Sequence, residues 1–237
     1  MKKFELTSEF VTLLGKKLFR IKALISFGNV KEGELGGFVE KEENLSNDGN
    51  AWVSGNAWVS GNTRVCGDAR VYGNARVYGD AEVYGDARVY GNARVYGDAE
   101  VYGDAEVCGD ARVYGNTRVC GDAWVYGNAR VYGDAEVYGD ARVYGNARVY
   151  GDAWVCGDAW VSGNADYATV HGFGSEYRTT TFFRTKAGDI GVRCGCFYGT
   201  LEEFRAKVKE THGETKTAKE YLRVADLMEF RFSKEEV

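Results

Sequence analysis

The chain has 237 residues, 32 of them glycine and none of them proline, and its formal net charge is −5. This acidic balance excludes a general electrostatic preference for nucleic acid or for anionic membranes. No segment approaches the roughly 18–20 consecutive apolar residues of a membrane span, and the opening MKKFELTSEF lacks the apolar run of a signal peptide. We therefore expect a cytoplasmic protein with no membrane partner.

Residues 1–48 lack the repeat that fills the centre of the chain, and they read as short strands. The stretch FVTLLGKKLFRIKAL, residues 10–24, predicts a hairpin that turns at Gly15-Lys16-Lys17. GELGGFVEKEENLS, residues 33–46, then leads into the repeats. Because a stack of repeats must hide the backbone groups of its first strands, we predict that residues 1–48 form an N-terminal β cap.

From Gly49 to Asp166 the chain repeats every six residues as G-[DN]-[AT]-x-V-[YCS], and glycine begins twenty successive units. Within A-x-V-Y the side chains alternate, so Ala and Val share one face of a short strand while the variable residue and Tyr share the other. Gly-Asp and Gly-Asn favour a turn because they tolerate positive φ. Each unit therefore predicts one strand and one corner, which must stack on other units to satisfy its backbone groups.

The residue after each glycine indicates that the full repeat is eighteen residues long rather than six. It follows an Asp-Asn-Asp cycle from Asp68 to Asp104, falters at Asp110 and Asn116, and resumes from Asp122 to Asn164. The phrase GNARVYGDAEVYGDARVY, residues 73–90, accordingly recurs at 127–144. Three units per turn predict a triangular prism of about 6–7 coils. Its narrow core of Val and Ala leaves no room for an internal ligand pocket.

Residues 169–237 abandon the repeat and predict a small α+β unit. TTTFFRTKAGDIGVRCGCF, residues 179–197, reads as a β-hairpin that turns at 187–189. Helices are predicted at 199–213 and 217–230, with capping boxes at Thr200…Glu203 and Thr217…Glu220 and a stop at Gly213. The predicted core residues of this unit are Phe197, Leu201, Phe204, Val208, Tyr221, Leu222, Ala225 and Leu227.

The array resembles the hexapeptide-repeat family, whose pattern of one aliphatic and one small residue per six is matched by V-Y-G-D-A-R. The resemblance implies a mainly β fold, with a left-handed parallel β-helix over residues 49–168, and it implies trimers. It also implies an alternative activity, because relatives include acyltransferases that use a histidine base beside a coil. His171, just past the array, is the residue that could take this role. Relatives that resemble γ-class carbonic anhydrases need three zinc-binding histidines, and this chain has two.

Sorting the units by eighteen residues gives three sides of different charge. Side one carries three arginines against seven acidic residues, with Asp at its corners from Asp68 to Asp158. Side three carries two arginines against seven acidic residues. Side two is basic, because it carries five arginines against only Asp110 and Asp166, the latter placed at the end of its outward row. The small net charge therefore conceals one basic side and two acidic sides.

Side two is the candidate binding surface. In one interpretation it is a solvated ladder in which each Arg lies over neighbouring Tyr rings by cation–π contact. In the other it is a flat basic and aromatic surface for an anionic partner, and retaining five stacked arginines favours such a use. Its residues are Arg76, Arg94, Arg112, Arg130, Arg148, Tyr78, Tyr96, Tyr114, Tyr132 and Tyr150.

The cysteines do not form a pattern typical of disulfides or metal sites, and we expect no cofactor or metal. Four of the six occupy the tyrosine position of the repeat: Cys66, Cys108, Cys120 and Cys156. A Cys2His2 site built from Cys194, Cys196, His171 and His212 is an alternative, since zinc needs four convergent ligands. Calcium at the Asp corners is another, but the nine-residue calcium repeat is absent.

The flanks resemble uncharacterised proteins of bacteriophages and prophages, on DIGVRCGCFYGTLEEF, KETHG and GNVKEGELGGFVEKEENLS. No nucleophilic triad or phosphate loop is recognisable. The sequence therefore predicts a non-catalytic scaffold or binding protein in the cytoplasm of a bacterial host. Its expected partner is a protein or its own copies, with a trimer favoured and nucleic acid less favoured. Two alternatives stay open, an inhibitor of a host defence factor and an acyltransferase-like enzyme.

Overall fold

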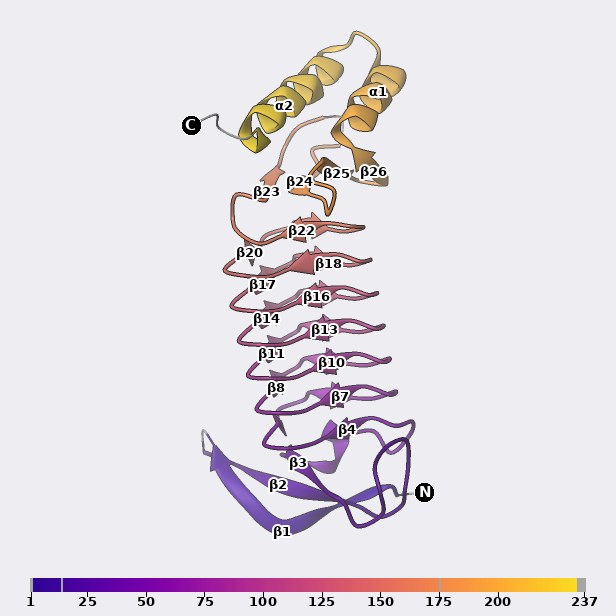
Figure 1. Cartoon of the computed structure of the whole chain (residues 1–237), viewed down its shortest axis with the longest axis vertical. Helices are drawn as coiled ribbons and strands as arrows, with labels where there is room; N and C mark the ends of the chain where they lie inside the picture. The colour runs from indigo at the N-terminus through magenta and orange to yellow at the C-terminus, as the bar shows by residue number, and fades with distance from the viewer. Residues whose placement is uncertain (1, 14, 175, 234–237) are drawn as a thin grey trace.

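The computed structural model describes residues 2–13, 15–174 and 176–233. A stack of coils runs along the long axis of the molecule, with strands at the N-terminal end and two helices at the C-terminal end (Figure 1). The mainly β solenoid expected from the sequence is therefore confirmed, with about seven turns of roughly eighteen residues.

The N-terminal cap is a hairpin joined to the first coils. Strand β1 (Phe4–Leu13) pairs antiparallel with β2 (Lys16–Ala23), and β2 pairs antiparallel with β3 (Leu35–Val39). The 3-10 turn η1 (Glu42–Asn44) follows. The hairpin is confirmed, but the expected turn at Gly15-Lys16-Lys17 is wrong in part, because Lys16 and Lys17 pair with β1 as part of β2.

Two contacts fix this cap to the solenoid. Strand β3 pairs in parallel with β5, so the cap continues one of the solenoid sheets. The buried Lys3 donates from its Nζ to the carbonyl oxygens of Gly49 at 3.2 Å and Ala51 at 2.9 Å. Burial lowers the pKa of Lys3 to about 8, against the opposing effect of Asp48 and Asp68. The cap thus provides, in β3, a strand edge with which the first coil pairs.

Each side of the array is a parallel sheet in which every strand pairs with the strand eighteen residues further on. Side one comprises β4 (Trp52–Val53), β7 (Arg70–Val71), β10 (Arg88–Val89), β13 (Glu106–Val107), β16 (Trp124–Val125), β19 (Arg142–Val143) and β22 (Trp160–Val161). Side two comprises β5 (Trp58–Val59), β8 (Arg76–Gly79), β11 (Arg94–Gly97), β14 (Arg112–Gly115), β17 (Arg130–Gly133) and β20 (Arg148–Val149). Side three comprises β6 (Arg64–Val65), β9 (Glu82–Val83), β12 (Glu100–Val101), β15 (Arg118–Val119), β18 (Glu136–Val137) and β21 (Trp154–Val155).

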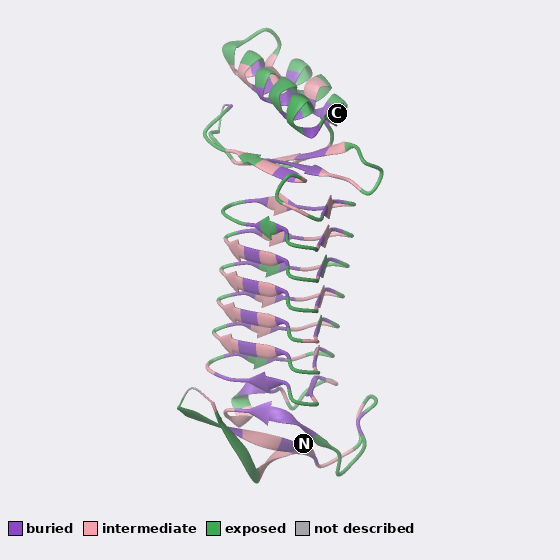
Figure 2. Cartoon of the chain, turned by 60° about the vertical axis from the view of Figure 1, so that its left-hand side comes forward, coloured by how far each residue is buried: buried purple, intermediate pink, exposed green. Residues whose placement is uncertain are grey.

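The core is the column of Ala and Val predicted from the alternation. Every repeat valine from Val53 to Val161 and every repeat alanine from Ala51 to Ala159 has no exposed surface. The variable residue and Tyr point outward, so buried and partly exposed residues alternate along each strand and the corners are exposed (Figure 2). The outward positions are therefore free to vary without disturbing the core.

The C-terminal unit is a four-stranded antiparallel sheet covered by two helices. The sheet comprises β23 (Tyr167–Val170), β24 (Thr180–Arg184), β25 (Ile190–Cys194) and β26 (Phe197–Thr200). The predicted hairpin corresponds to β24 and β25, and β23 and β26 extend it. Thr181 on β24 accepts a hydrogen bond from the Trp154 backbone N–H at 2.9 Å, so this sheet covers the open end of the solenoid.

The exit from the array differs from the expected one. Asp166 does not extend the outward row of side two, because its carboxylate accepts hydrogen bonds from the backbone N–H and hydroxyl of Ser162 and the N–H of Gly163. The C-terminal sheet then begins at Tyr167, two residues before the boundary placed at 168/169.

The helices are α1 (Leu201–His212) and α2 (Lys216–Phe232). The capping box at Thr200 and the stop at Gly213 are confirmed. The capping box at Thr217 is wrong, because Thr215 is the N-cap of α2 and accepts from the Ala218 N–H. The predicted core is wrong at Leu227, which is 57% exposed while Met228 is buried. Neither helix, within the described ranges, is long and apolar enough to cross a membrane.

Candidate binding surface on side two

Parallel pairing without a register shift stacks the arginines of side two directly on one another. Arg76 pairs with Arg94, Arg94 with Arg112, Arg112 with Arg130, and Arg130 with Arg148. Like charges directly opposite each other in a sheet repel. Five guanidinium groups therefore form one continuous cationic row along the solenoid.

Three of the five arginines on the other two sides are paired with a glutamate of the next coil, and none of the side-two arginines is. Arg88 contacts Glu106 at 3.2 Å, Arg118 contacts Glu136 at 3.3 Å, and Arg64 contacts Glu82 at 3.8 Å, each between adjacent coils. Among residues 2–13, 15–174 and 176–233, none of the five side-two arginines has a salt bridge. The positive charge of side two thus faces solvent without a carboxylate partner.

The tyrosines of side two form a stacked row beside the arginines. Ring centroids lie 4.8 Å apart from Tyr78 to Tyr96 and from Tyr96 to Tyr114, 5.1 Å from Tyr114 to Tyr132, and 5.4 Å from Tyr132 to Tyr150. Two residues that the sequence reasoning missed close the row. Trp58 stacks on Tyr78 at 5.4 Å, and the buried Tyr167 meets Tyr150 edge-on at 6.3 Å.

This stacking replaces the cation–π ladder considered from the sequence. The tyrosine rings cover one another, and in the part of the chain that the structure describes only Arg76 of the five lies over an aromatic ring, that of Trp58 at 5.7 Å. The row therefore presents ring edges and hydroxyl groups to solvent rather than ring faces. Burial raises the pKa of Tyr96, with smaller contributions from Tyr78 and Tyr114.

The hydroxyl groups of side two also lack the acceptor that the other sides provide. On side three the Tyr84 hydroxyl donates to Glu100 at 3.1 Å, and on side one the Tyr90 hydroxyl donates to Glu106 at 2.8 Å. The corresponding partner of Tyr78 is Arg94, which has no acceptor atom. In the described ranges, no hydrogen bond joins the hydroxyl of any side-two tyrosine to another residue. The arginines and the free tyrosine hydroxyls of side two can therefore all donate hydrogen bonds to a bound partner.

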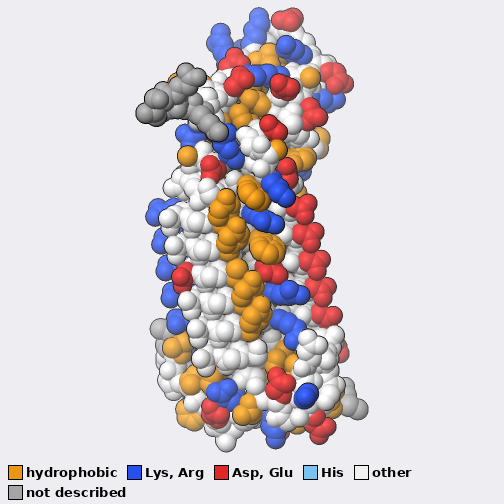
Figure 3. Space-filling model, viewed as in Figure 1, with side chains coloured by type: hydrophobic (Ala, Val, Ile, Leu, Met, Phe, Trp, Pro, Cys, Tyr) orange, Lys and Arg blue, Asp and Glu red, His pale blue; other side chains and the backbone are white. Residues whose placement is uncertain are grey.

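The corner that side two shares with side one is nearly neutral. Asn74 donates to Asn92 at 3.2 Å, and Asn128 donates to Asn146 at 3.3 Å, so the corner residues bond along the stack. The one acidic corner residue, Asp110, accepts from Asn92 at 3.1 Å. In the space-filling view one column of basic side chains runs along one edge of the solenoid and a column of acidic side chains runs along the opposite edge, with further basic side chains on the face between them (Figure 3).

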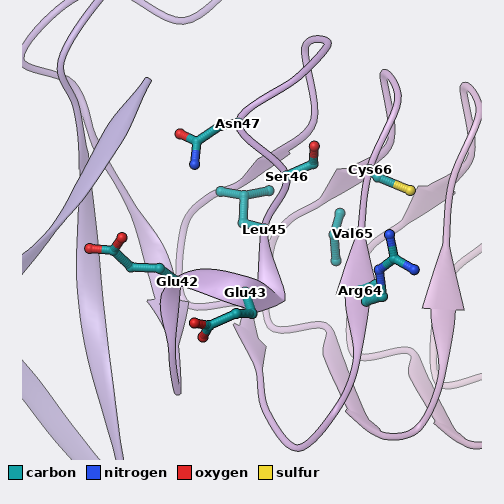
Figure 4. A pocket seen from close by; sticks show the side chains of 8 residues that line it. All are labelled: Glu42, Glu43, Leu45, Ser46, Asn47, Arg64, Val65 and Cys66. Carbon is teal, nitrogen blue, oxygen red and sulfur yellow. The ribbon is translucent and has the colours of Figure 1, made fainter. Parts of the chain in front are cut away.

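A separate hollow lies where the cap meets side three. Glu42 and Glu43 lie on the cap side of it, whereas Arg64 begins the first strand of side three and Cys66 directly follows that strand (Figure 4). Its volume is about 320 Å³. Arg64 is already paired with Glu82, so the hollow offers no free cation beside its carboxylates.

The histidines and the close cysteine pair do not converge. His171 is exposed between β23 and β24, with its Nδ1 3.0 Å from Thr179 Oγ1, whereas His212 stacks on Tyr221. Cys194 accepts a hydrogen bond from Thr180 at 3.1 Å. Throughout the described ranges, no three His, Cys, Asp or Glu side chains are grouped so that they could hold a metal ion. The alternative Cys2His2 site is therefore not assembled.

Comparison with known families agrees with the solenoid. Seven segments match the YdcK beta solenoid repeat. They cover residues 63–79, 69–85, 81–97, 87–103, 105–121, 123–139 and 141–157, all within the array. No curated protein matches the chain. The array is therefore similar to a known β-solenoid repeat, and the matched segments include all five arginines and all five tyrosines of side two.

Proposed function

We propose that the protein is a non-catalytic scaffold that binds an anionic macromolecular partner through side two. One observation carries this proposal: five consecutive guanidinium groups have no carboxylate partner, although three of the five arginines on the other sides are each paired with a glutamate. An unsatisfied row of like charges costs stability, and a partner that supplies carboxylates would relieve the repulsion. The adjacent tyrosine hydroxyls add neutral donors to the same surface.

A protein partner fits this surface better than a nucleic acid. Single-stranded nucleic acids bind by stacking their bases on exposed aromatic faces. The faces of Tyr96 and Tyr114 are covered by neighbouring rings 4.8 Å away, so bases would find only ring edges. The partner that we propose is therefore an acidic protein surface, which accepts hydrogen bonds and needs no stacking.

The cellular setting is a further part of the proposal. The hexapeptide-like repeat and the phage-like flanks suggest a phage-encoded protein acting in the bacterial cytoplasm, and inhibition of a host defence factor is one form that binding could take. Acyl transfer has less support, because His171 is exposed in the C-terminal unit and hydrogen-bonds only to Thr179 among the described residues.

Binding of fluorescent poly-L-glutamate, followed by anisotropy, tests the proposal. The wild-type protein should bind this probe with an affinity that falls steeply as salt is added. Reversing the row with Arg94→Glu, Arg112→Glu and Arg130→Glu should weaken binding at least tenfold. The matched control changes the net charge by the same amount but on side one, with Arg70→Glu, Arg88→Glu and Arg142→Glu. Because its side-two row is intact, it should bind the probe more tightly than the side-two variant does. Equal weakening by both variants would contradict the proposal.

A further inference from the structure

The acidic edge of the solenoid lies opposite its basic side. Its members are the corner residues between side three and side one: Asp68, Asp86, Asp104, Asp122, Asp140 and Asp158. Because each side of a triangular prism faces the edge shared by the other two, this edge points away from side two. The two columns accordingly run along opposite edges in Figure 3.

The central carboxylates of the acidic edge are free. Asp68 accepts from Asn50 at one end, and Asp158 accepts from Tyr198 at the other. Across the described part of the chain, the four exposed aspartates between them, Asp86, Asp104, Asp122 and Asp140, have no salt bridge or side-chain hydrogen bond.

The neighbouring edge, between side two and side three, is different. Asn116 interrupts its acidic residues, and Asp80 and Asp134 each accept from an asparagine of the preceding coil. The edge opposite side two is therefore the one uninterrupted row of aspartates in the array.

The basic row and the acidic edge have the same spacing. Each contributes one charge per coil, and the coils are 4.8 Å apart, as the stacked rings of Tyr78, Tyr96 and Tyr114 show. The arginine row of one molecule can therefore place one guanidinium group opposite one carboxylate of the acidic edge at every coil. The phosphates of one DNA strand rise by about 3.4 Å per step and wind around the axis, so they cannot stay in register with this row.

We propose that the partner of side two is the acidic edge of a second copy of this chain, with guanidinium groups and carboxylates paired rung by rung. This inference rests on the proposed function of side two and names its partner. The two surfaces point in opposite directions on one molecule, so each copy can bind one neighbour on each flank. Such a heterologous contact repeats by translation and gives an open row of parallel rods, rather than the closed trimer expected from the resemblance.

Complementary charge swaps test the inference. The face variant carries Arg94→Glu, Arg112→Glu and Arg130→Glu, and the edge variant carries Asp86→Lys, Asp104→Lys and Asp122→Lys. Each variant alone opposes like charges, so both should sediment as a 26.2 kDa monomer at low salt. The wild-type protein should gain mass with concentration at low salt and return to the monomer at high salt. An equal mixture of the two variants should assemble again, because Glu then meets Lys and Arg meets Asp.

Three outcomes would overturn the inference: a wild-type protein that stays monomeric at all salt concentrations, assembly that survives in either variant, or a mixture that stays monomeric. Circular dichroism and thermal melting establish beforehand that both variants fold. Binding of poly-L-glutamate separates the two proposals. A wild-type monomer that still binds this probe through side two would sink the inference and leave the proposed function standing.

Discussion

At the scale of single residues, the corner glycines allow the coils to stack closely, because they have no Cβ. Gly97 has a φ of +75°, and a Cβ built on it would lie 3.0 Å from the Gly115 backbone nitrogen in the next coil. Gly151 has a φ of +65° but no atom within 4 Å of such a Cβ, and Gly163 has neither the positive φ nor a neighbour. The three positions thus separate backbone strain from the steric effect of stacking.

Substituting these three glycines with alanine should give a graded loss of stability. Gly151→Ala should lower the free energy of unfolding by about 1–2 kcal/mol, because alanine resists the left-handed region. Gly97→Ala should cost more, since its methyl group also presses on the next coil. Gly163→Ala should change stability by less than about 0.5 kcal/mol. Chemical denaturation measures all three, and equal losses at Gly97 and Gly151 would show that stacking distance plays no part.

At the scale of the strand, the tyrosine rows link coils that the short strands alone join by few hydrogen bonds. Tyr84 stacks on Tyr102 at 4.8 Å, as Tyr72 does on Tyr90. Burial raises the pKa of Tyr84 to about 12, assisted by the charge of Glu100 and the hydrogen bond to it. Burial likewise raises the pKa of Tyr72, Tyr96 and Tyr126. Ionisation of these tyrosine hydroxyls should therefore destabilise the folded state.

Alkaline pH should consequently destabilise the protein. A tyrosine whose pKa is higher in the folded state than in the unfolded state contributes stability that is complete below about pH 10 and is lost as the pH rises through the folded value. We expect the free energy of unfolding to fall between about pH 10 and pH 12. Ultraviolet titration of tyrosinate should show delayed ionisation in the folded protein and ordinary ionisation in urea. Identical titration curves in the two states would contradict this expectation.

The sequence predicts the pairing of strands well where the same repeat recurs in many successive coils. The Asp68-Asn74-Asp80 cycle sets the eighteen-residue coil, and in-register pairing then stacks Arg on Arg and Tyr on Tyr. The ring stacking of Tyr78 on Tyr96 follows from that register, although the alternation alone suggested cation–π contacts instead. In α2 the signals conflict, because Thr215 and Thr217 are both plausible caps. The predicted core there included Leu227, which is exposed, and omitted Met228, which is buried. No local pattern indicated that Trp58 and Tyr167 close the tyrosine row.

At the scale of the whole molecule, the solenoid has a length, set by its number of coils, and an order of units, which decides the side on which each unit lies. The core is nearly the same on every side, because Val and Ala fill it throughout except where the buried Thr63 and Thr117 replace alanine on side three. The outward residues do distinguish them, since five successive arginines occupy side two where side three carries both Glu and Arg. Length and the identity of each side are therefore separate properties of the array.

Two internal deletions should separate these properties. Removing residues 91–108 deletes one coil and keeps every later unit on its own side. Removing residues 91–96 shifts every later unit by one side, so Glu100 follows Arg76 in the side-two row. Both proteins should fold by circular dichroism, because both keep the Val and Ala core. The first should bind poly-L-glutamate nearly as well as the wild type, and the second should lose at least tenfold. Equal binding by both would show that the row is not the binding element.

The parallel link from β3 to β5 also bears on how the chain is made. The cap lies first in the sequence, and each later strand pairs with one formed only eighteen residues earlier. During synthesis the cap would therefore leave the ribosome before the first coil that pairs with it, and each later coil could pair with the preceding coil as it emerges. Folding would then keep pace with synthesis, and only the most recent coil would expose an unpaired edge until the C-terminal sheet covered it.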